Sequence, residues 1–129
     1  MLDPRIAQAL DQPQTIDITT TGRRSGEPRR IEIVFFNFGG RIYISGIPNP
    51  DRERAWLSNL RADPAMTFHL KGAVSADLPA TARVITDPDE RRPIIEQVAR
   101  AWRRDPDVMQ AHSPLIEVII EGYAPPVAA

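Results

Sequence analysis

The chain contains one stretch, residues 16–36, whose pattern restricts the possible folds most strongly. Residues 16–18 alternate apolar and polar side chains, and residues 31–36 begin in the same alternation and then become apolar on both faces. Alternation with a period of two is typical of a β-strand, so the stretch predicts a strand, a loop and a second strand. A strand that passes from one buried face to two is expected where a sheet curls into a barrel or meets a partner.

The loop between these strands, residues 19–30, contains four arginines, four hydroxyl side chains and two glycines. Arginine offers a planar fork of donors, and Ser and Thr add hydroxyl groups. Glycines allow consecutive backbone amides to turn inward and form a concave nest. The loop therefore predicts an anion site, with phosphate as the expected anion. A solvated hairpin loop whose arginines only keep the protein soluble is the alternative.

Composition excludes several other classes of site. The chain has 129 residues, which is the size of one domain, and we expect a single domain over 1–129. Its net charge is −1, so anion recognition must be local. It has no cysteine and two histidines, and we expect no metal site. No apolar run approaches the ~20 residues of a membrane helix, and the N-terminus lacks a signal-peptide core. We expect a cytoplasmic protein with no membrane partner.

The remaining elements complete a short-stranded pattern. Strands joined by short turns predict a mostly antiparallel sheet, and the fold class is α+β, a small six-stranded barrel with flanking helices. The predicted strands are residues 14–21, 29–38, 41–45, 66–71, about 80–86 and 114–121. The predicted helices are residues 1–12, a segment capped by Asn49 that ends near Asp63, and 87–102.

Two motifs carry a resemblance to a known family. Residues 20–29 read TTGRRSGEPR, and residues 55–64 read AWLSNLRADP. Together they resemble the deazaflavin-dependent nitroreductase family over residues 15–104. The resemblance implies an FMN-binding-type split β-barrel and the phosphate-bearing cofactor coenzyme F-420. It also implies an oxidoreductase that moves a hydride from the reduced deazaflavin to a small electron-poor organic substrate.

The resemblance also implies which residues contact the cofactor. The loop residues match the part of the family motif that holds the cofactor's phosphate and acidic tail, and the end of the third strand lies where family members approach the cofactor with their backbone. Trp56 either stacks on a ring system or docks its helix on the barrel. Asn59 either bonds the cofactor or satisfies backbone groups. The implied cofactor-binding residues are Arg23, Arg24, Ser25, Gly26, Arg29, Ser45, Gly46, Trp56 and Asn59.

One segment departs from the family. Family reductases often carry tyrosines between the last helix and the last strand, whereas residues 103–113 contain none. The substrate side and the proton donor therefore stay open, and the sequence names no catalytic residue. His112 is a candidate proton donor, and we expect His69, on the more polar face of its strand, to be structural or a surface residue.

Other functions fit part of the pattern. An FMN-binding oxidoreductase of the same fold would use the same arginines for its phosphate. A non-catalytic module that binds flavin or another ligand would keep only the anion site. We expect no nucleic-acid partner, because the arginines are few and aromatic stacking platforms are absent. We do expect a homodimer, because Val34, Phe35 and Phe36 supply more apolar surface than a small barrel needs.

Overall fold

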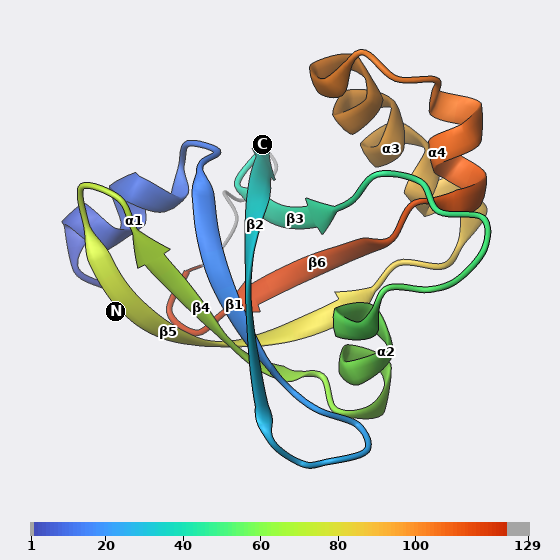
Figure 1. Cartoon of the computed structure of the whole chain (residues 1–129). Helices are drawn as coiled ribbons and strands as arrows, with labels where there is room; N and C mark the ends of the chain where they lie inside the picture. Colours follow the sequence, from blue (N-terminus) through green and yellow to red (C-terminus); the bar gives the residue numbers. More distant parts are fainter. Residues whose placement is uncertain (1, 124–129) are drawn as a thin grey trace.

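The computed structural model describes residues 2–123, and within them six strands form a closed barrel (Figure 1). The order around the barrel is β1-β2-β3-β6-β5-β4, and every pairing among these strands is antiparallel. The strands are β1 (Thr15–Thr21), β2 (Pro28–Phe38), β3 (Arg41–Ser45), β4 (Ala65–Lys71), β5 (Ser75–Val84) and β6 (Leu115–Ile120). The helices are α1 (Pro4–Leu10), α2 (Ala55–Ala62), α3 (Pro88–Trp102) and α4 (Pro106–His112). The predicted α+β barrel with flanking helices is confirmed.

Strand β2 changes partner along its length, and this change closes the barrel. From Pro28 to Val34 it pairs with β1, and from Phe35 to Phe38 it pairs with β3. Phe35 points into the barrel core, where its ring meets the edge of Phe68 at a centroid distance of 5.3 Å. Phe36 points outward into a second apolar cluster that includes α3. The apolar faces predicted for this strand therefore serve barrel curvature and helix packing.

Phe36 is covered by a helix of its own chain, so the apolar surface from which a homodimer was predicted is largely buried within one chain. Phe36 is 6% exposed, and its ring lies 5.4 Å from that of Trp102 on α3 of the same chain. Phe35 is fully buried, so only Val34 of the three is open, at 36% exposure. The apolar surface of β2 gives little support to a partner chain, and the dimer stays a prediction.

Three of the helices begin with the same device, an aspartate followed by proline. Asp3, Asp87 and Asp105 each accept a hydrogen bond from a backbone N–H of the first turn, at 2.8–2.9 Å. Proline at the first helical position loses no hydrogen bond, because that N–H has no partner in the helix. Helix α3 begins at Pro88 with Pro93 inside it, close to the predicted range of residues 87–102.

Other boundaries differ from the predictions. Helix α2 does not start at Asn49, whose side chain instead accepts from the Asp51 N–H at 3.0 Å in a local turn; the helix begins at Ala55 without a side-chain cap. Strand β5 begins at Ser75, because the turn after β4 is tight and Lys71 pairs with Ser75. Helix α4 was not predicted.

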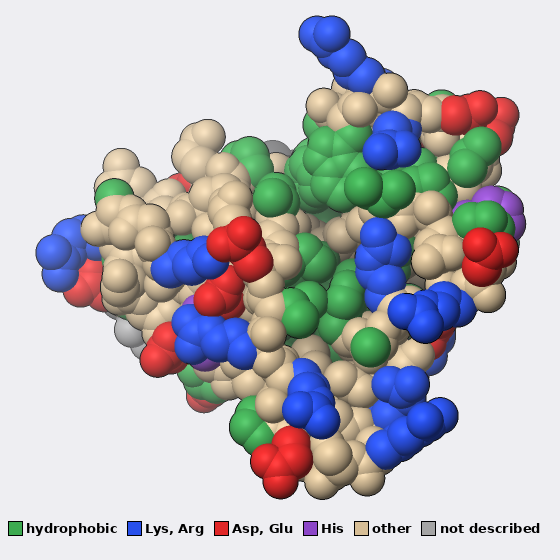
Figure 2. Space-filling view, in the orientation of Figure 1, with side chains coloured by type: hydrophobic (Ala, Val, Ile, Leu, Met, Phe, Trp, Pro, Cys, Tyr) green, Lys and Arg blue, Asp and Glu red, His purple; other side chains and the backbone are tan. Residues whose placement is uncertain are grey.

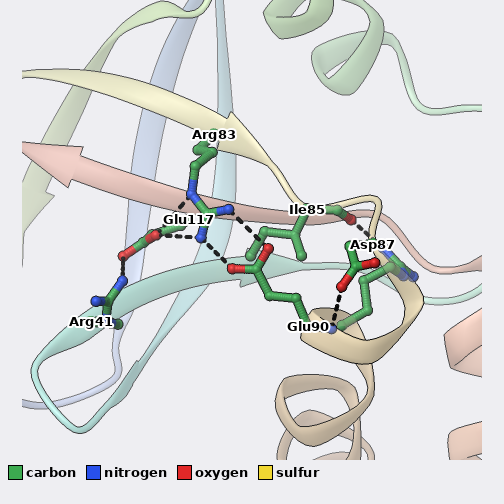
Figure 3. Close-up of polar contacts among 7 residues, drawn as sticks. Arg41, Arg83, Ile85, Asp87, Glu90 and Glu117 are labelled. Atoms are coloured by element: carbon green, nitrogen blue, oxygen red, sulfur yellow. Dashed lines mark hydrogen bonds and ion pairs between the residues drawn. The ribbon is translucent and has the colours of Figure 1, made fainter.

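An ion-pair network fixes α3 to the barrel wall (Figure 3). Glu117 of β6 is buried and accepts hydrogen bonds from Arg41 of β3 and Arg83 of β5, the shortest to each being 3.1 and 2.8 Å. Arg83 also donates two hydrogen bonds to Glu90 in the first turn of α3, at 3.0 and 2.6 Å. One arginine therefore joins two strands and a helix, and α3 with its neighbour α4 stands at that end of the barrel (Figure 1).

Candidate functional site

The basic loop between β1 and β2 forms a compact turn. The Gly22 N–H donates to the Glu27 carbonyl, and the Gly26 N–H donates to the Gly22 carbonyl, both at 2.8 Å. Gly26 has a φ of +71°, a left-handed conformation that other residues adopt at a cost. The Ser25 hydroxyl accepts a hydrogen bond from the Glu27 N–H at 3.1 Å, which stabilises the turn. The loop turns as predicted, but the amides of Gly22, Arg23, Gly26 and Glu27 donate to protein groups and do not form the expected anion nest.

Asn59 of α2 ties this loop to the barrel. Its side-chain oxygen accepts from the backbone N–H and from the guanidinium of Arg23, both at 3.1 Å. Its amide nitrogen donates to the Thr20 hydroxyl on β1, also at 3.1 Å. Asn59 is 4% exposed, so these bonds form largely away from water. Of its two predicted roles, the structure shows the one in which Asn59 satisfies a backbone group, and contact with the cofactor stays a prediction.

A cavity of about 360 Å³ lies between the loop and α2. Its lining contains four arginines and no carboxylate; Arg30 pairs with Asp17 at 2.9 Å. Among residues 2–123, none of the other three, Arg23, Arg24 and Arg29, has an acidic partner within 4.0 Å. Basic side chains gather over this part of the surface, where α2 and the lower ends of β1 and β2 lie (Figure 2). The loop is therefore a locally positive site on a chain of net charge −1.

Trp56 packs its helix on the barrel and also reaches the cavity, while stacking on a ring system stays a prediction. It is 7% exposed and packs in the barrel core with Leu57 and Leu60 of the same helix. It also forms part of the cavity wall, together with Ala55 and Asn59. A change at this residue is thus expected to affect both packing and the cavity.

Not all of the predicted site residues come together. Ser45 is buried, and its hydroxyl donates to the Pro114 carbonyl at 2.6 Å. Gly46 lies against the guanidinium of Arg54, so that a β-carbon added there would sit 2.8 Å from it. Arg54 and Pro114 line a second cavity on the other side of α2. Six predicted residues line the first cavity: Arg23, Arg24, Ser25, Arg29, Trp56 and Asn59.

The cavities also contain residues outside the implied cofactor-binding set, although Thr20 and Arg30 belong to the loop that was predicted as an anion site. Thr20, Arg30 and Ile31 line the first one, and Arg54 lines the second. The pair Asp105-Pro106 repeats the start of α3 and was the available sign of α4, whose end lines the second cavity.

His69 has an unexpected arrangement on the outside of the barrel. Its Nε2 lies 2.7 Å from the Thr19 hydroxyl, and its Nδ1 lies 2.7 Å from the Asp77 carboxylate. The hydrogen bond from His69 holds the pKa of Asp77 below its ordinary value. The order hydroxyl, imidazole, carboxylate resembles a hydrolytic triad, but none of the three residues lines either cavity. The group joins β1, β4 and β5, and the structural role expected for His69 fits this placement.

Comparison with known proteins decides the family. The F420H(2)-dependent quinone reductase family matches residues 2–121. The chain belongs to this family. Its cofactor is coenzyme F-420, as the two sequence motifs implied, and flavin-binding proteins occur among the structural neighbours.

Solved structures agree with the fold. A conserved hypothetical protein from Mycobacterium tuberculosis is 18% identical with a TM-score of 0.69. The match covers 94% of this chain and 81% of that one. A putative pyridoxamine 5'-phosphate oxidase from Listeria innocua is 18% identical with a TM-score of 0.67, and 91% of each chain is covered. An F420-H2 dependent reductase is 19% identical with a TM-score of 0.61. The match covers 81% of this chain and 92% of that one. These neighbours show the split-barrel fold.

Residues 2–123 contain no group of three or more side chains that could hold a metal ion. No helix there is long and apolar enough to cross a membrane.

Proposed function

We propose that Arg23, Arg24 and Arg29 bind the phosphate and acidic tail of coenzyme F-420, and that the chain is a reductase of small electron-poor organic compounds. The three guanidinium groups without acidic partners carry this proposal. They fit the group chemically, because arginine binds phosphate and carboxylate through charge-assisted hydrogen bonds. The cavity is near the lower limit for ligand sites and suits one end of a long cofactor.

The residues of this chain would act by binding and orienting. When bound, the reduced deazaflavin supplies the hydride, and a quinone or nitro compound is the proposed acceptor. The arginines hold the distal end, and Asn59 holds the arginine loop against α2. Trp56 walls the cavity and excludes water. Anchoring a remote end fixes the position of the reacting end, which is the main contribution a protein makes to hydride transfer.

Two finer features belong to the same proposal. One structural neighbour, 20% identical with a TM-score of 0.60, is described as a domain-swapped dimer, and we propose a homodimer here. We also keep the expected cytoplasmic location and the single domain over residues 1–129 as proposals.

The experiment that tests the function is a titration with coenzyme F-420. Replacing Arg23, Arg24 or Arg29 by alanine should weaken binding about ten-fold or more, since each removes a charge-assisted contact. A cofactor analogue without the phosphate should bind weakly to the native protein and respond little to these changes. Arg100→Ala is the control, because Arg100 is an exposed residue of α3 outside both cavities. Unchanged affinity in the triple variant would leave the loop as a solvated turn and remove the basis of the proposal.

The same titration separates the alternatives. Tighter binding of FMN than of coenzyme F-420 would favour a flavoprotein. Cofactor binding without turnover of quinones, nitroaromatics or enones would favour a non-catalytic module.

A further inference from the structure

A second cavity, of about 470 Å³, lies on the opposite side of α2 from the arginine loop. Leu57 and Arg61 of α2 line it, whereas Trp56 and Asn59 line the first cavity. Its other walls are the loop 49–54, the connection 84–86 and residues 110–115 at the end of α4. Its volume is typical of small-molecule sites. The helix thus separates two cavities of similar size.

This second cavity is positive. Its lining contains four arginines and one carboxylate, Glu53, which is paired with Arg61 at 2.8 Å. Arg91 donates to the carbonyls of Ile85, Gln110 and Ser113 at 2.9–3.0 Å, so its hydrogen bonds are used while its charge has no carboxylate opposite. Backbone carbonyls therefore fix the position of the Arg91 guanidinium in the cavity wall, and its positive charge is not neutralised by a carboxylate of the described residues.

Of the two arginines in this lining that have no partner among the described residues, Arg52 is exposed and Arg54 is half-buried. Its guanidinium packs against Gly46, and within residues 2–123 its side chain has no hydrogen-bond or ion-pair partner. Partial burial lowers its pKa, yet a guanidinium stays charged at neutral pH. A half-buried cation without a partner at a cavity wall is suited to an anionic ligand.

Two more polar atoms in the cavity lining lack partners. They are the Ser113 hydroxyl and the side-chain oxygen of Gln110, both buried. Ser113 is 6% exposed, while its backbone groups are bonded to Arg91 and Met109. An unpaired buried polar group is unfavourable, so such groups call for a partner. A ligand in the cavity would provide one once the Ser113 and Gln110 side chains turn toward it.

We propose that the second cavity binds a small carboxylic acid that also carries a hydrogen-bond donor. Arg54 would hold the carboxylate, and Gln110 and Ser113 would bond the rest of the ligand. The binding site stands on these residues alone; only its use as the acceptor site for hydride rests on the proposed reductase function. In that case the enzyme prefers acidic acceptors.

The test uses 4-hydroxybenzoate as a probe, measured by calorimetric titration without cofactor, with 4-hydroxybenzamide as its neutral counterpart. The native protein should bind the acid and not the amide. Arg54→Gln should weaken acid binding about ten-fold or more, since a charge-assisted contact is lost. Arg54 is chosen over Arg91 because Arg91 holds three carbonyls of the fold. Arg100→Gln is the matched control and should bind like the native protein.

The variant Ser113→Ala distinguishes a ligand-binding serine from a purely structural one, because stability and acid affinity are expected to respond differently. The free protein should be as stable as the native one or more stable, because the buried hydroxyl has no partner to lose. Acid binding should nevertheless weaken. A loss of stability with unchanged affinity would contradict the assignment.

Three results would overturn the proposal: equal binding of acid and amide, native affinity in Arg54→Gln, or displacement of the acid by coenzyme F-420, which would assign the cavity to the cofactor. The triple alanine variant of the arginine loop separates the two proposals, because it should lose coenzyme F-420 and keep the acid. If it keeps both, the proposed function fails while the acid site stands.

Discussion

At the scale of single residues, Asn59 positions part of the proposed site through hydrogen bonds to other protein groups. Its oxygen accepts two hydrogen bonds from Arg23, and its nitrogen donates one to Thr20. Both neighbours are parts of the first cavity, so one amide fixes the position of a proposed binding arginine relative to the barrel.

We predict that Asn59→Ala lowers stability by about 1–3 kcal/mol, because it leaves buried polar groups without partners. It should also weaken coenzyme F-420 binding through the loosened loop. Asn37→Ala is the matched comparison: Asn37 also makes three hydrogen bonds within the fold but lines neither cavity, so its loss should lower stability with little effect on affinity. Urea unfolding and cofactor titration measure both quantities, and native affinity in Asn59→Ala would exclude the positioning role.

Trp56 allows a spectroscopic prediction. Because it lines the first cavity, its fluorescence should change when coenzyme F-420 binds. The other tryptophan, Trp102, packs on Phe36 in the outer cluster, and Trp102→Phe removes its background emission. In that background the titration should show the change, and Trp56→Phe should abolish it and weaken binding. Trp56→Phe with native affinity and a lower melting temperature would leave Trp56 as a core residue only.

At the scale of elements, the sequence predicted best where side-chain alternation and caps act locally. Strands β1 to β4 and helix α3 follow from these patterns almost to their ends. The start of α2 was wrong because Asn49-Pro50 has the composition of a helix cap but forms a separate turn. Helix α4 was missed because seven residues are too few for a clear apolar period.

The contact between α3 and the barrel yields a pH prediction. The hydrogen bonds from Arg83 hold the pKa of Glu90 below its ordinary value of 4.5. A carboxyl whose pKa is lower in the folded state stabilises the fold above the unfolded value, and this contribution is lost as the pH falls through the folded value. We therefore expect Glu90→Gln to melt below the native protein at neutral pH.

The difference between native protein and Glu90→Gln should shrink as the pH drops from about 4.5 into the more acidic range. Circular dichroism melting curves from neutral pH downward measure it. Glu96→Gln is the control for charge, because Glu96 pairs with Arg92 inside α3 and not with the barrel. A constant difference between native and Glu90→Gln at all pH values would show that the Glu90–Arg83 pair does not cause it.

At the scale of the whole molecule, the sequence was enough to predict the barrel. It was not enough to predict that two separate cavities lie on either side of α2. Strand count and short connections were enough for the fold class. The two cavities depend on which face of α2 each residue occupies and on long-range neighbours such as Arg54 and Ser113. Local sequence patterns do not contain that information. Ser45 and Gly46, which the family resemblance implied as cofactor-binding residues, lie beside the second cavity and not beside the arginine loop.

The charge distribution of the whole chain gives the last prediction. The net charge is −1, whereas each cavity carries an excess of arginine, so attraction of an anionic cofactor comes from local charges against a nearly neutral background. The Debye length shortens from about 10 Å at 0.1 M salt to about 3 Å at 1 M, which screens exposed arginines strongly. Affinity for coenzyme F-420 should therefore fall with rising NaCl concentration. The triple alanine variant of Arg23, Arg24 and Arg29 should show a much flatter dependence, and Arg100→Ala should follow the native curve. Equal slopes for the native protein and the triple variant would mean that the attraction arises elsewhere, with the arginines of the second cavity as the next set to replace.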